Sequence, residues 1–281
     1  MGPYPEPYAS HLPPLLAAAF AEDLPDLTGI AVFAPDDRTS AVLVAKKAGV
    51  VCGMPAFAAA FAFLDPGCTV ELIHVDGEKV AAGETAAKVS GPTRAILAAE
   101  RTALNFATRL SGIATLTRRF VGAVEGTRCR VLDTRKTTPG WRALEKHAVR
   151  CGGGTNHRMG LFDAAMLKDT HLAAAGSLTA AVAKVRERWG ESVPLVVECA
   201  TLAMVEEGLA CGVTHIMLDN MDLGAIRQAV TLVAGRARLE ASGGVTLETA
   251  HALAETGVDF ISVGALTHSA PALDLSMQVR P

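Results

Sequence analysis

The sequence of 281 residues predicts an α/β protein with two domains, a small mixed domain followed by a β/α barrel. Its composition, 50% hydrophobic and 20% charged, is sufficient to bury a sizeable core. Up to about residue 106, short strand-like segments alternate with Asp-Gly and Pro-Gly turns, which is typical of an antiparallel sheet. Beyond residue 128, short apolar runs alternate with amphipathic helical stretches, which indicates a parallel sheet covered by helices.

Composition also excludes several classes of protein. A positive mean hydropathy and a formal net charge of −3 exclude a disordered chain. The longest uncharged stretch, residues 48–64, is interrupted by Gly53 and Pro55 and is shorter than the roughly 20 apolar residues of a membrane-spanning helix. The first residues lack a basic segment followed by an apolar run, so we expect no secretory signal and a cytoplasmic location.

The six cysteines give no metal-finger pattern. They stand at positions 52, 68, 129, 151, 199 and 211, without a Cys-x-x-Cys pair and without histidine at finger spacing. No cysteine is beside an obvious base, so a catalytic thiol is the less favoured interpretation. We expect buried free thiols.

The first domain is expected over residues 1–106. Helices are predicted at residues 15–24 and 55–64, and strands in the segments SAVLVAKKAGVVCG and CTVELIHV. From Arg94 a strong helical pattern continues in segments to Val124 and is predicted to connect the two domains. The barrel is expected over residues 107–265, and the tail 266–281 can pack back on the first domain.

The barrel is predicted from repetition of one unit. The apolar runs lie at residues 129–134, 164–169, 195–200, 215–220, 238–244 and 260–265. Amphipathic helices are predicted between them at residues 179–189, 202–210, 223–232 and 246–255. About six strand-helix units favour a β/α barrel.

Polar residues recur where these runs end. They are Asp133 to Lys136, Lys168, Glu198, Asp219, Ser242 to Gly244, and Gly264. The carboxyl ends of the strands of a β/α barrel meet on one face, where active sites are assembled. Ordinary polar loops would explain the polarity, but not charged groups at the last position of strand after strand. We therefore expect these residues to converge.

Positive charge is concentrated in one segment. Residues 128–168 contain nine basic and three acidic side chains, while residues 1–106 contain seven basic and twelve acidic ones. This asymmetry indicates a polyanionic ligand. Arginine forks suit carboxylates and phosphates, and the candidate anion-binding residues are Arg135, Lys136, His157, Arg158 and Lys168. By contrast, Arg142, Lys146 and Arg150 have helical spacing and are predicted to form a solvated face.

Two further features indicate phosphate and metal binding. Glycine-rich loops at residues 242–244 and 263–266 follow the last two predicted strands, the usual phosphate site of this architecture, although either loop alone could be an ordinary turn. Glu198 and Asp219 end neighbouring strands and could hold Mg²⁺ together with ligand phosphates. Alternatively, they contact ribose hydroxyls, or form structural ion pairs with Lys168 and Arg135.

Five stretches carry a resemblance to a known family. They are ERTALNFATRLSGIATLT, DTRKTTPGWRALEKHAVRCGGGTNHRMGLFDAAMLKDTH, HIMLDN, EASGG and GVDFISVGALTHSAPALDLS. In this order they resemble quinolinate phosphoribosyltransferase, also called nicotinate-nucleotide pyrophosphorylase (carboxylating). The resemblance implies an N-terminal α/β open sandwich, an incomplete barrel of about six strands, and a homodimer whose active site is shared across subunits. It also implies the reaction of quinolinate with phosphoribosyl pyrophosphate to give nicotinate mononucleotide, pyrophosphate and CO₂, a step of de novo NAD biosynthesis.

The resemblance assigns roles residue by residue. For quinolinate it implies Arg135, His157, Arg158 and Lys168, with Arg101 reaching in from the other subunit. For phosphoribosyl pyrophosphate and Mg²⁺ it implies Lys136, Glu198 and Asp219, and for the 5′-phosphate Ser242, Gly243 and Gly264. Lys136, Lys168, Glu198 and Asp219 are the predicted catalytic residues. The sequence departs from the family pattern at Pro25, Thr170 and Ala200, without loss of any of these charged groups.

Three alternatives stay open from the sequence alone. A lysine at a strand end, Lys168, is also what a Schiff-base aldolase requires, although the surplus of arginines does not suit it. Nucleic-acid binding through residues 128–168 is disfavoured by overall acidity and 5% aromatic content. A related transferase associated with molybdate uptake is expected to depart from the NHR segment, which is intact here.

Overall fold

A computed structural model describes residues 6–280, which divide into two compact units. Of the described residues, the first unit comprises 6–118, 137–153 and 266–280, and the second comprises 119–136 and 154–265. The boundary predicted at residues 106 and 107 lies within one continuous helix, α4 (Thr93–Ala123), and the predicted domain limits remain a proposal. Within the described residues, no helix has the length and apolar character needed to cross a membrane.

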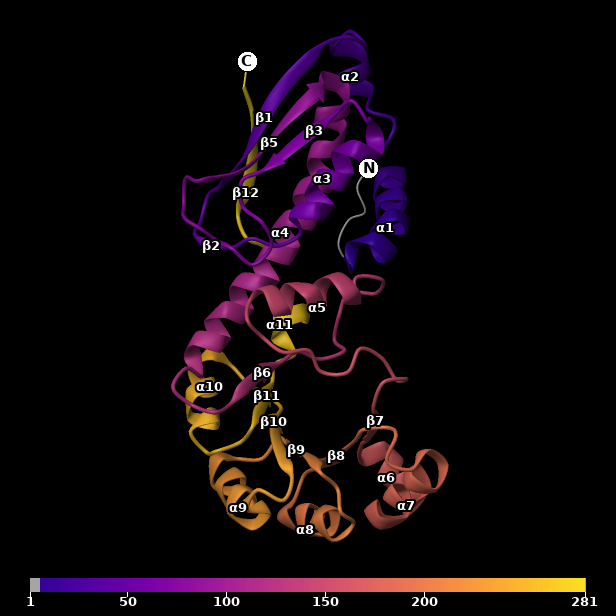
Figure 1. Cartoon of the computed structure of the whole chain (residues 1–281), viewed down its shortest axis with the longest axis vertical. Coiled ribbons are helices and arrows are strands. Elements are labelled where there is room, and N and C mark those ends of the chain that lie inside the picture. Colours follow the sequence, from indigo (N-terminus) through magenta and orange to yellow (C-terminus); the bar gives the residue numbers. More distant parts are fainter. Residues whose placement is uncertain (1–5, 281) are drawn as a thin grey trace. The chain divides into compact units, whose positions relative to one another are not determined.

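The first unit is built on an antiparallel sheet with the strand order β12-β1-β5-β3 (Figure 1). Its strands are β1 (Arg38–Ala45), β3 (Thr69–Leu72), β5 (Thr85–Pro92) and β12 (Leu275–Arg280). β12 pairs with β1 so that Met277 lies opposite Leu43, and the last described strand therefore joins the sheet of the first unit. A separate antiparallel pair is formed by β2 (Gly49–Val50) and β4 (Lys79–Val80).

Three further helices belong to this unit: α1 (Tyr8–Asp23), α2 (Leu27–Val32) and α3 (Met54–Leu64). One of them, α3, packs on the sheet. The helix predicted at residues 15–24 therefore begins seven residues earlier, while the one predicted at 55–64 is confirmed. Phe57 and Phe61 of α3 are fully buried, as α3 contacts β3 on one side and α1 on the other.

Helix α4 is one unbroken helix of 31 residues rather than the predicted series of segments. α5 (Arg142–Cys151) belongs to the first unit, where the Trp141 ring before it stacks on Phe106 of α4 with ring centroids 4.5 Å apart. The prediction of a solvated face on α5 was wrong for Lys146, which is fully buried. Leu144, Ala148 and Val149 of α5 are buried as well, so other parts of the protein surround most of this helix, including the position of Lys146.

The second unit holds six parallel strands in the order β6-β11-β10-β9-β8-β7. They are β6 (Arg130–Leu132), β7 (Ala165–Leu167), β8 (Leu195–Cys199), β9 (His215–Asp219), β10 (Arg238–Ser242) and β11 (Phe260–Ser262). Each predicted apolar run contains one strand. Among the described strands β6 and β7 are not paired, so the barrel is incomplete and the predicted fold class is confirmed.

Helices flank these strands on the outside (Figure 1). They are α6 (Asp169–Ala175), α7 (Leu178–Trp189), α8 (Leu202–Ala210), α9 (Leu223–Val233) and α10 (Leu247–Ala254), and α11 (Ala265–His268) follows the last parallel strand. Side-chain oxygens of Ser177, Thr201 and Asp222 cap the first turns of α7, α8 and α9. These caps satisfy N–H groups that a helix leaves unbonded, and thereby fix where each of these helices begins.

Candidate active site

A cavity of about 650 Å³ opens at the carboxyl ends of the six parallel strands. Every strand contributes lining residues, at or near its end or in the loop after it, and the segment 157–158 adds two more. The lining residues are Asp133, Thr134, Arg135, Lys136, His157, Arg158, Met166, Lys168, Glu198, Met217, Asp219, Asn220, Glu240, Ser242, Gly243, Gly244 and Ser262. The predicted convergence of Arg135, Lys168 and Asp219 is therefore observed. The cavity lies wholly within the second unit.

The buried carboxylate of Asp133, directly after β6, positions the segment that carries His157 and Arg158. One of its oxygens accepts from the His157 backbone N–H at 2.8 Å, and the other accepts from the Asn156 amide at 2.6 Å. The segment is tied further where the Thr155 N–H donates to the Val131 carbonyl at 2.8 Å. These charge-assisted hydrogen bonds fix the backbone from which the side chains of His157 and Arg158 extend.

A buried Glu240 lines the cavity and contacts two histidines, His157 and His215. Its Oε2 lies 2.9 Å from His215 Nε2 and 3.3 Å from His157 Nε2, and the Ser262 hydroxyl donates to Oε1. Burial would raise the pKa of this carboxyl, but the neighbouring His157, His215 and Ser262 together outweigh burial and lower the pKa to about 2. Glu240 is therefore ionised and fixes the orientation of His157.

We expect the substitution Glu240→Gln to lower the free energy of unfolding by roughly 3 kcal/mol at pH 7, because the pKa of Glu240 falls from 4.5 to about 2 on folding. A depressed carboxyl pKa stabilises the fold above the unfolded value. That stabilisation is lost as pH falls toward the folded value. The gap between wild type and variant should therefore narrow below about pH 4.5. Urea unfolding between pH 3 and pH 7 measures the gap between wild type and variant, and a gap independent of pH would show that folding leaves the pKa of Glu240 unchanged.

Two guanidinium groups lie close enough in the cavity to affect each other. The pKa of Arg158 is lowered, first by burial and then by the charge of Arg135, with Asp163 opposing. Arg158 Nη1 donates to the Ala164 carbonyl at 2.9 Å, whereas the buried Nε of Arg135 has no hydrogen-bond partner within residues 6–280. An anion bound between the two guanidinium groups would offset their mutual repulsion. It would also accept a hydrogen bond from the buried Nε of Arg135.

Lys168, Glu198 and Asp219 form another part of the lining. Lys168 Nζ lies 3.3 Å from Glu198 Oε2, so one of the two ion pairs considered from the sequence is present. Asp219 Oδ2 accepts from the Asn220 amide at 3.0 Å. Glu198 and Asp219 belong to the paired strands β8 and β9 and both line the cavity, so they offer two carboxylates to the same space. This donor set, oxygen only, suits Mg²⁺ completed by phosphate oxygens and water.

The loop after β10 brings backbone to the cavity. Gly243 has a φ of +96°, and a Cβ there would lie 2.1 Å from Asn220 Oδ1, so only glycine fits. Ser242, Gly243 and Gly244 line the cavity, as a phosphate loop requires.

Two predicted site residues lie outside this cavity. Gly264 lies two residues beyond β11 and is not among the lining residues. Arg101 is an exposed residue of α4 in the first unit, where it lines a different hollow of about 400 Å³ with residues of α2. The barrel cavity of a single chain therefore does not include Arg101.

Several lining residues were missed from the sequence. They are Asn220, Glu240, Ser262, Met166 and Met217. His215 was missed too; it does not line the cavity, but its Nε2 lies 2.9 Å from Glu240 Oε2. A glutamate inside the apolar run RLEASGG was the available signal, because a charge in a buried strand needs partners.

The comparisons with known proteins agree with this architecture. Two family models match: "Quinolinate phosphoribosyl transferase, N-terminal domain" over residues 26–111 and "Quinolinate phosphoribosyl transferase, C-terminal domain" over residues 113–278. The chain belongs to the quinolinate phosphoribosyltransferase family. The resemblance found in the sequence is thus confirmed.

Individual members of the family are similar over nearly the whole chain. A probable nicotinate-nucleotide pyrophosphorylase (carboxylating) of Bacillus subtilis is 43% identical, over 94% of this chain and 92% of that protein. The Synechocystis protein with the same description is 46% identical, over 86% and 83%. The crystal structure of NadC from Streptococcus pyogenes is 43% identical with a TM-score of 0.91, and the alignment covers 95% of each chain.

Proposed function

We propose that this enzyme of the quinolinate phosphoribosyltransferase family transfers the phosphoribosyl group of phosphoribosyl pyrophosphate to quinolinate. The products are nicotinate mononucleotide, pyrophosphate and CO₂, and the step belongs to de novo NAD biosynthesis. One observation carries the proposal: a single cavity collects the cations Arg135, Arg158 and Lys168 next to the carboxylates Glu198 and Asp219. The names of relatives at 43% and 46% identity support the same activity.

The cationic side of the cavity suits a pyridine dicarboxylate. The planar guanidinium groups of Arg135 and Arg158 lie near each other, and each can form two parallel hydrogen bonds to a carboxylate. Lys168 adds a third positive charge. The His157 ring lines the cavity, and its orientation is fixed because Nε2 lies 3.3 Å from Glu240 Oε2 and Nδ1 accepts from the Arg158 N–H at 2.7 Å. We assign these four residues to quinolinate.

The remaining lining suits phosphoribosyl pyrophosphate. Ser242 and Gly243 would bind the 5′-phosphate through the loop after β10, where Gly264 is a further predicted contact, and Lys136 lies exposed at the rim for the pyrophosphate. Glu198 and Asp219 would hold Mg²⁺, directly or through water, and contact the ribose hydroxyls. When bound, Mg²⁺ would neutralise phosphate charge.

The reaction needs positioning and charge stabilisation more than covalent catalysis. The pyridine nitrogen attacks the anomeric carbon while the bond from that carbon to pyrophosphate breaks, and Lys136 stabilises the negative charge that grows on the leaving group. The ring nitrogen becomes positively charged. The carboxylate next to it then leaves as CO₂, its bonding electrons remain on the ring carbon beside the charged nitrogen, and a proton completes the product.

The alternatives considered from the sequence fit this cavity less well. A Schiff-base aldolase requires one activated lysine, but Lys168 is paired with Glu198 and faces a site with two arginines. A nucleic-acid surface would need exposed basic groups, whereas Arg158 and His157 are directed into a cavity.

We also propose a homodimer in which Arg101 completes the site of the other subunit. In this chain Arg101 is exposed and lies outside the barrel cavity, as a residue that acts in the partner's site would. A cytoplasmic location stays a prediction.

The test of the activity is formation of nicotinate mononucleotide from quinolinate and phosphoribosyl pyrophosphate, followed chromatographically with and without Mg²⁺. Nicotinate is the matched control substrate because it lacks the second carboxylate. We expect product from quinolinate and little or none from nicotinate. Equal rates with both would assign the arginines to another ligand.

We expect Arg158→Lys to weaken quinolinate binding by roughly tenfold to a hundredfold, since an ammonium replaces a fork with two parallel hydrogen bonds. The KM for phosphoribosyl pyrophosphate should change little. Steady-state kinetics with each substrate varied in turn makes the distinction, and an equal rise in both KM values would place Arg158 at the other ligand.

A further inference from the structure

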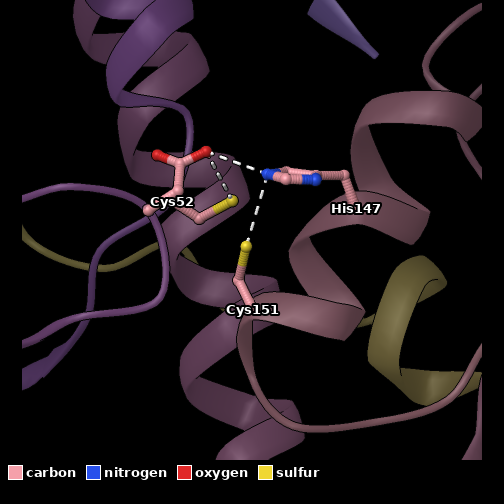
Figure 2. A group of neighbouring side chains, drawn as sticks. Cys52, His147 and Cys151 are labelled. Carbon is pink, nitrogen blue, oxygen red and sulfur yellow. Dashed lines mark hydrogen bonds and ion pairs between the residues drawn. The ribbon is translucent and has the colours of Figure 1, made fainter. Parts of the chain in front are cut away.

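A second group of reactive side chains lies in the first unit, away from the residues assigned to catalysis. It consists of Cys52, Asp76, His147 and Cys151. One ligand atom from each lies within 4.8 Å of the other three. Figure 2 shows the two sulfurs and the His147 ring turned toward one another.

The group is assembled from three separate segments. Cys52 lies between β2 and α3, Asp76 lies in the turn between β3 and β4, and His147 and Cys151 lie four residues apart on α5. Residues at positions i and i+4 share one face of a helix, which is also the spacing of paired metal ligands on a helix. This His-x-x-x-Cys spacing was present in the sequence, and the expectation that no cysteine is beside a base was wrong for Cys151.

We propose that these four side chains form a zinc site, with Cys52 Sγ, Cys151 Sγ, His147 Nε2 and Asp76 Oδ2 as ligands. Three of the ligand separations are 3.3 Å from His147 Nε2 to Cys151 Sγ, 3.0 Å from His147 Nε2 to Asp76 Oδ2, and 3.6 Å from Cys52 Sγ to Asp76 Oδ2, so small shifts bring the atoms to the spacing of a tetrahedral site. Zinc with bonds of about 2.0–2.3 Å places its tetrahedral ligands roughly 3.3–3.8 Å apart. Two sulfurs, one nitrogen and one oxygen favour zinc over magnesium or calcium.

Neighbouring groups fix the ligands in place. The Met54 N–H donates to Asp76 Oδ1 at 2.9 Å, and the Tyr8 hydroxyl donates to Asp76 Oδ2 at 2.5 Å. The Ser111 hydroxyl accepts from the Cys52 N–H at 2.9 Å and donates to its carbonyl at 3.0 Å. Hydrogen bonds of this kind orient the ligands of structural metal sites.

The surroundings also suit a closed, structural site. Cys52 and Tyr8 are fully buried, and the Asp76 and His147 side chains are 12% and 19% exposed. A thiolate is the form of cysteine that binds metal, and the Cys151 sulfur lies 3.3 Å from His147 Nε2. Arg150 Nη2 lies 3.3 Å from His147 Nδ1 and has to turn away when Nε2 binds zinc, which its exposed position permits.

The site would join parts of the chain that are distant in sequence. It links the loop before α3 and the turn at Asp76 to the end of α5, so bound zinc would contribute stability to the first unit rather than chemistry to the barrel cavity. If the protein did not bind zinc here, the proposed transferase activity would not be affected, because that activity rests on the barrel cavity.

The experiment uses the whole protein, without a polyhistidine tag, purified without chelator. We expect close to one zinc per chain by elemental analysis, and a lower melting temperature after removal of zinc with a chelator. Cobalt added to the zinc-free protein should give tetrahedral visible bands and thiolate-to-cobalt absorption. His147→Ala and Cys151→Ser should lose at least about 90% of the bound zinc, and Tyr8→Phe should weaken zinc binding roughly tenfold. Cys211→Ser, at a half-exposed cysteine outside the group, is the matched control and should bind zinc normally.

The cobalt spectrum of the unaltered protein tests the zinc site without any substitution, and circular dichroism reports whether each variant folds. Two results would overturn the proposal. One is wild-type protein that takes up neither zinc nor cobalt. A disulfide between Cys52 and Cys151 that persists under reducing conditions and prevents metal binding counts as this result. The other is zinc that stays bound in the folded His147 and Cys151 variants.

Discussion

Replacing Arg135 with alanine is expected to raise the KM for quinolinate about tenfold to a hundredfold, because one charge-assisted hydrogen bond contributes roughly 1.5–3 kcal/mol. Arg135 lies in the barrel cavity and carries a buried Nε without a hydrogen-bond partner within residues 6–280. Its neighbour Lys136 is exposed at the rim. Successive side chains of an extended segment point in opposite directions, so adjacent residues can contact different substrates.

The matched variant is therefore Lys136→Ala, which is expected to lower kcat about tenfold to a hundredfold with a smaller effect on the quinolinate KM. Charge on the departing pyrophosphate grows only as the bond breaks, so an interaction with it appears in kcat. Initial rates over a grid of both substrate concentrations separate the two patterns. If both variants changed the same parameter for the same substrate, Arg135 and Lys136 would share one ligand.

A mixture of Arg101→Ala and Lys168→Ala subunits is expected to recover about a quarter of wild-type activity, although each variant alone is nearly inactive. Random association makes half of the dimers mixed. If Arg101 serves the other subunit, each mixed dimer has one site with both residues intact and one with both missing. Lys168 is suited to this test because it lies inside the barrel cavity, whereas Arg101 does not.

Co-expression of the two chains with different affinity tags allows mixed dimers to be purified and assayed directly. A mixture of Arg101→Ala with wild type supplies the control for incomplete exchange. Mixed dimers without any recovered activity would mean that Arg101 serves its own chain.

The barrel could be predicted from the sequence because its signals are local. Each of the runs at residues 195–200, 215–220 and 238–244 is apolar, short and followed by helical periodicity, and each contains a strand. The positions of Lys168 and Asp219 followed in turn, since parallel strands bring their carboxyl ends to one edge.

What could not be predicted depends on contacts between distant positions. Glu240 is stabilised by His157, which is 83 positions earlier in the chain, and by Ser262 on the adjacent strand. Lys146 has the spacing of an exposed helical residue, but the surroundings of α5 bury it. Periodicity describes one element at a time, so partners supplied by other elements remain invisible to it.

The zinc ligands illustrate the same limit. Cys52 and Asp76 are each unremarkable in sequence, and only the fold brings them to His147 and Cys151. The His-x-x-x-Cys pair supplied half of the set, and the other half required the positions of two loops.

The most direct measurement follows CO₂ released from quinolinate labelled in the carboxyl group next to the ring nitrogen. We expect one CO₂ for each pyrophosphate formed, and release only when phosphoribosyl pyrophosphate and Mg²⁺ are both present. Loss of CO₂ without phosphoribosyl pyrophosphate, or pyrophosphate formation without CO₂, would contradict a mechanism in which ribosyl transfer to the ring nitrogen drives decarboxylation.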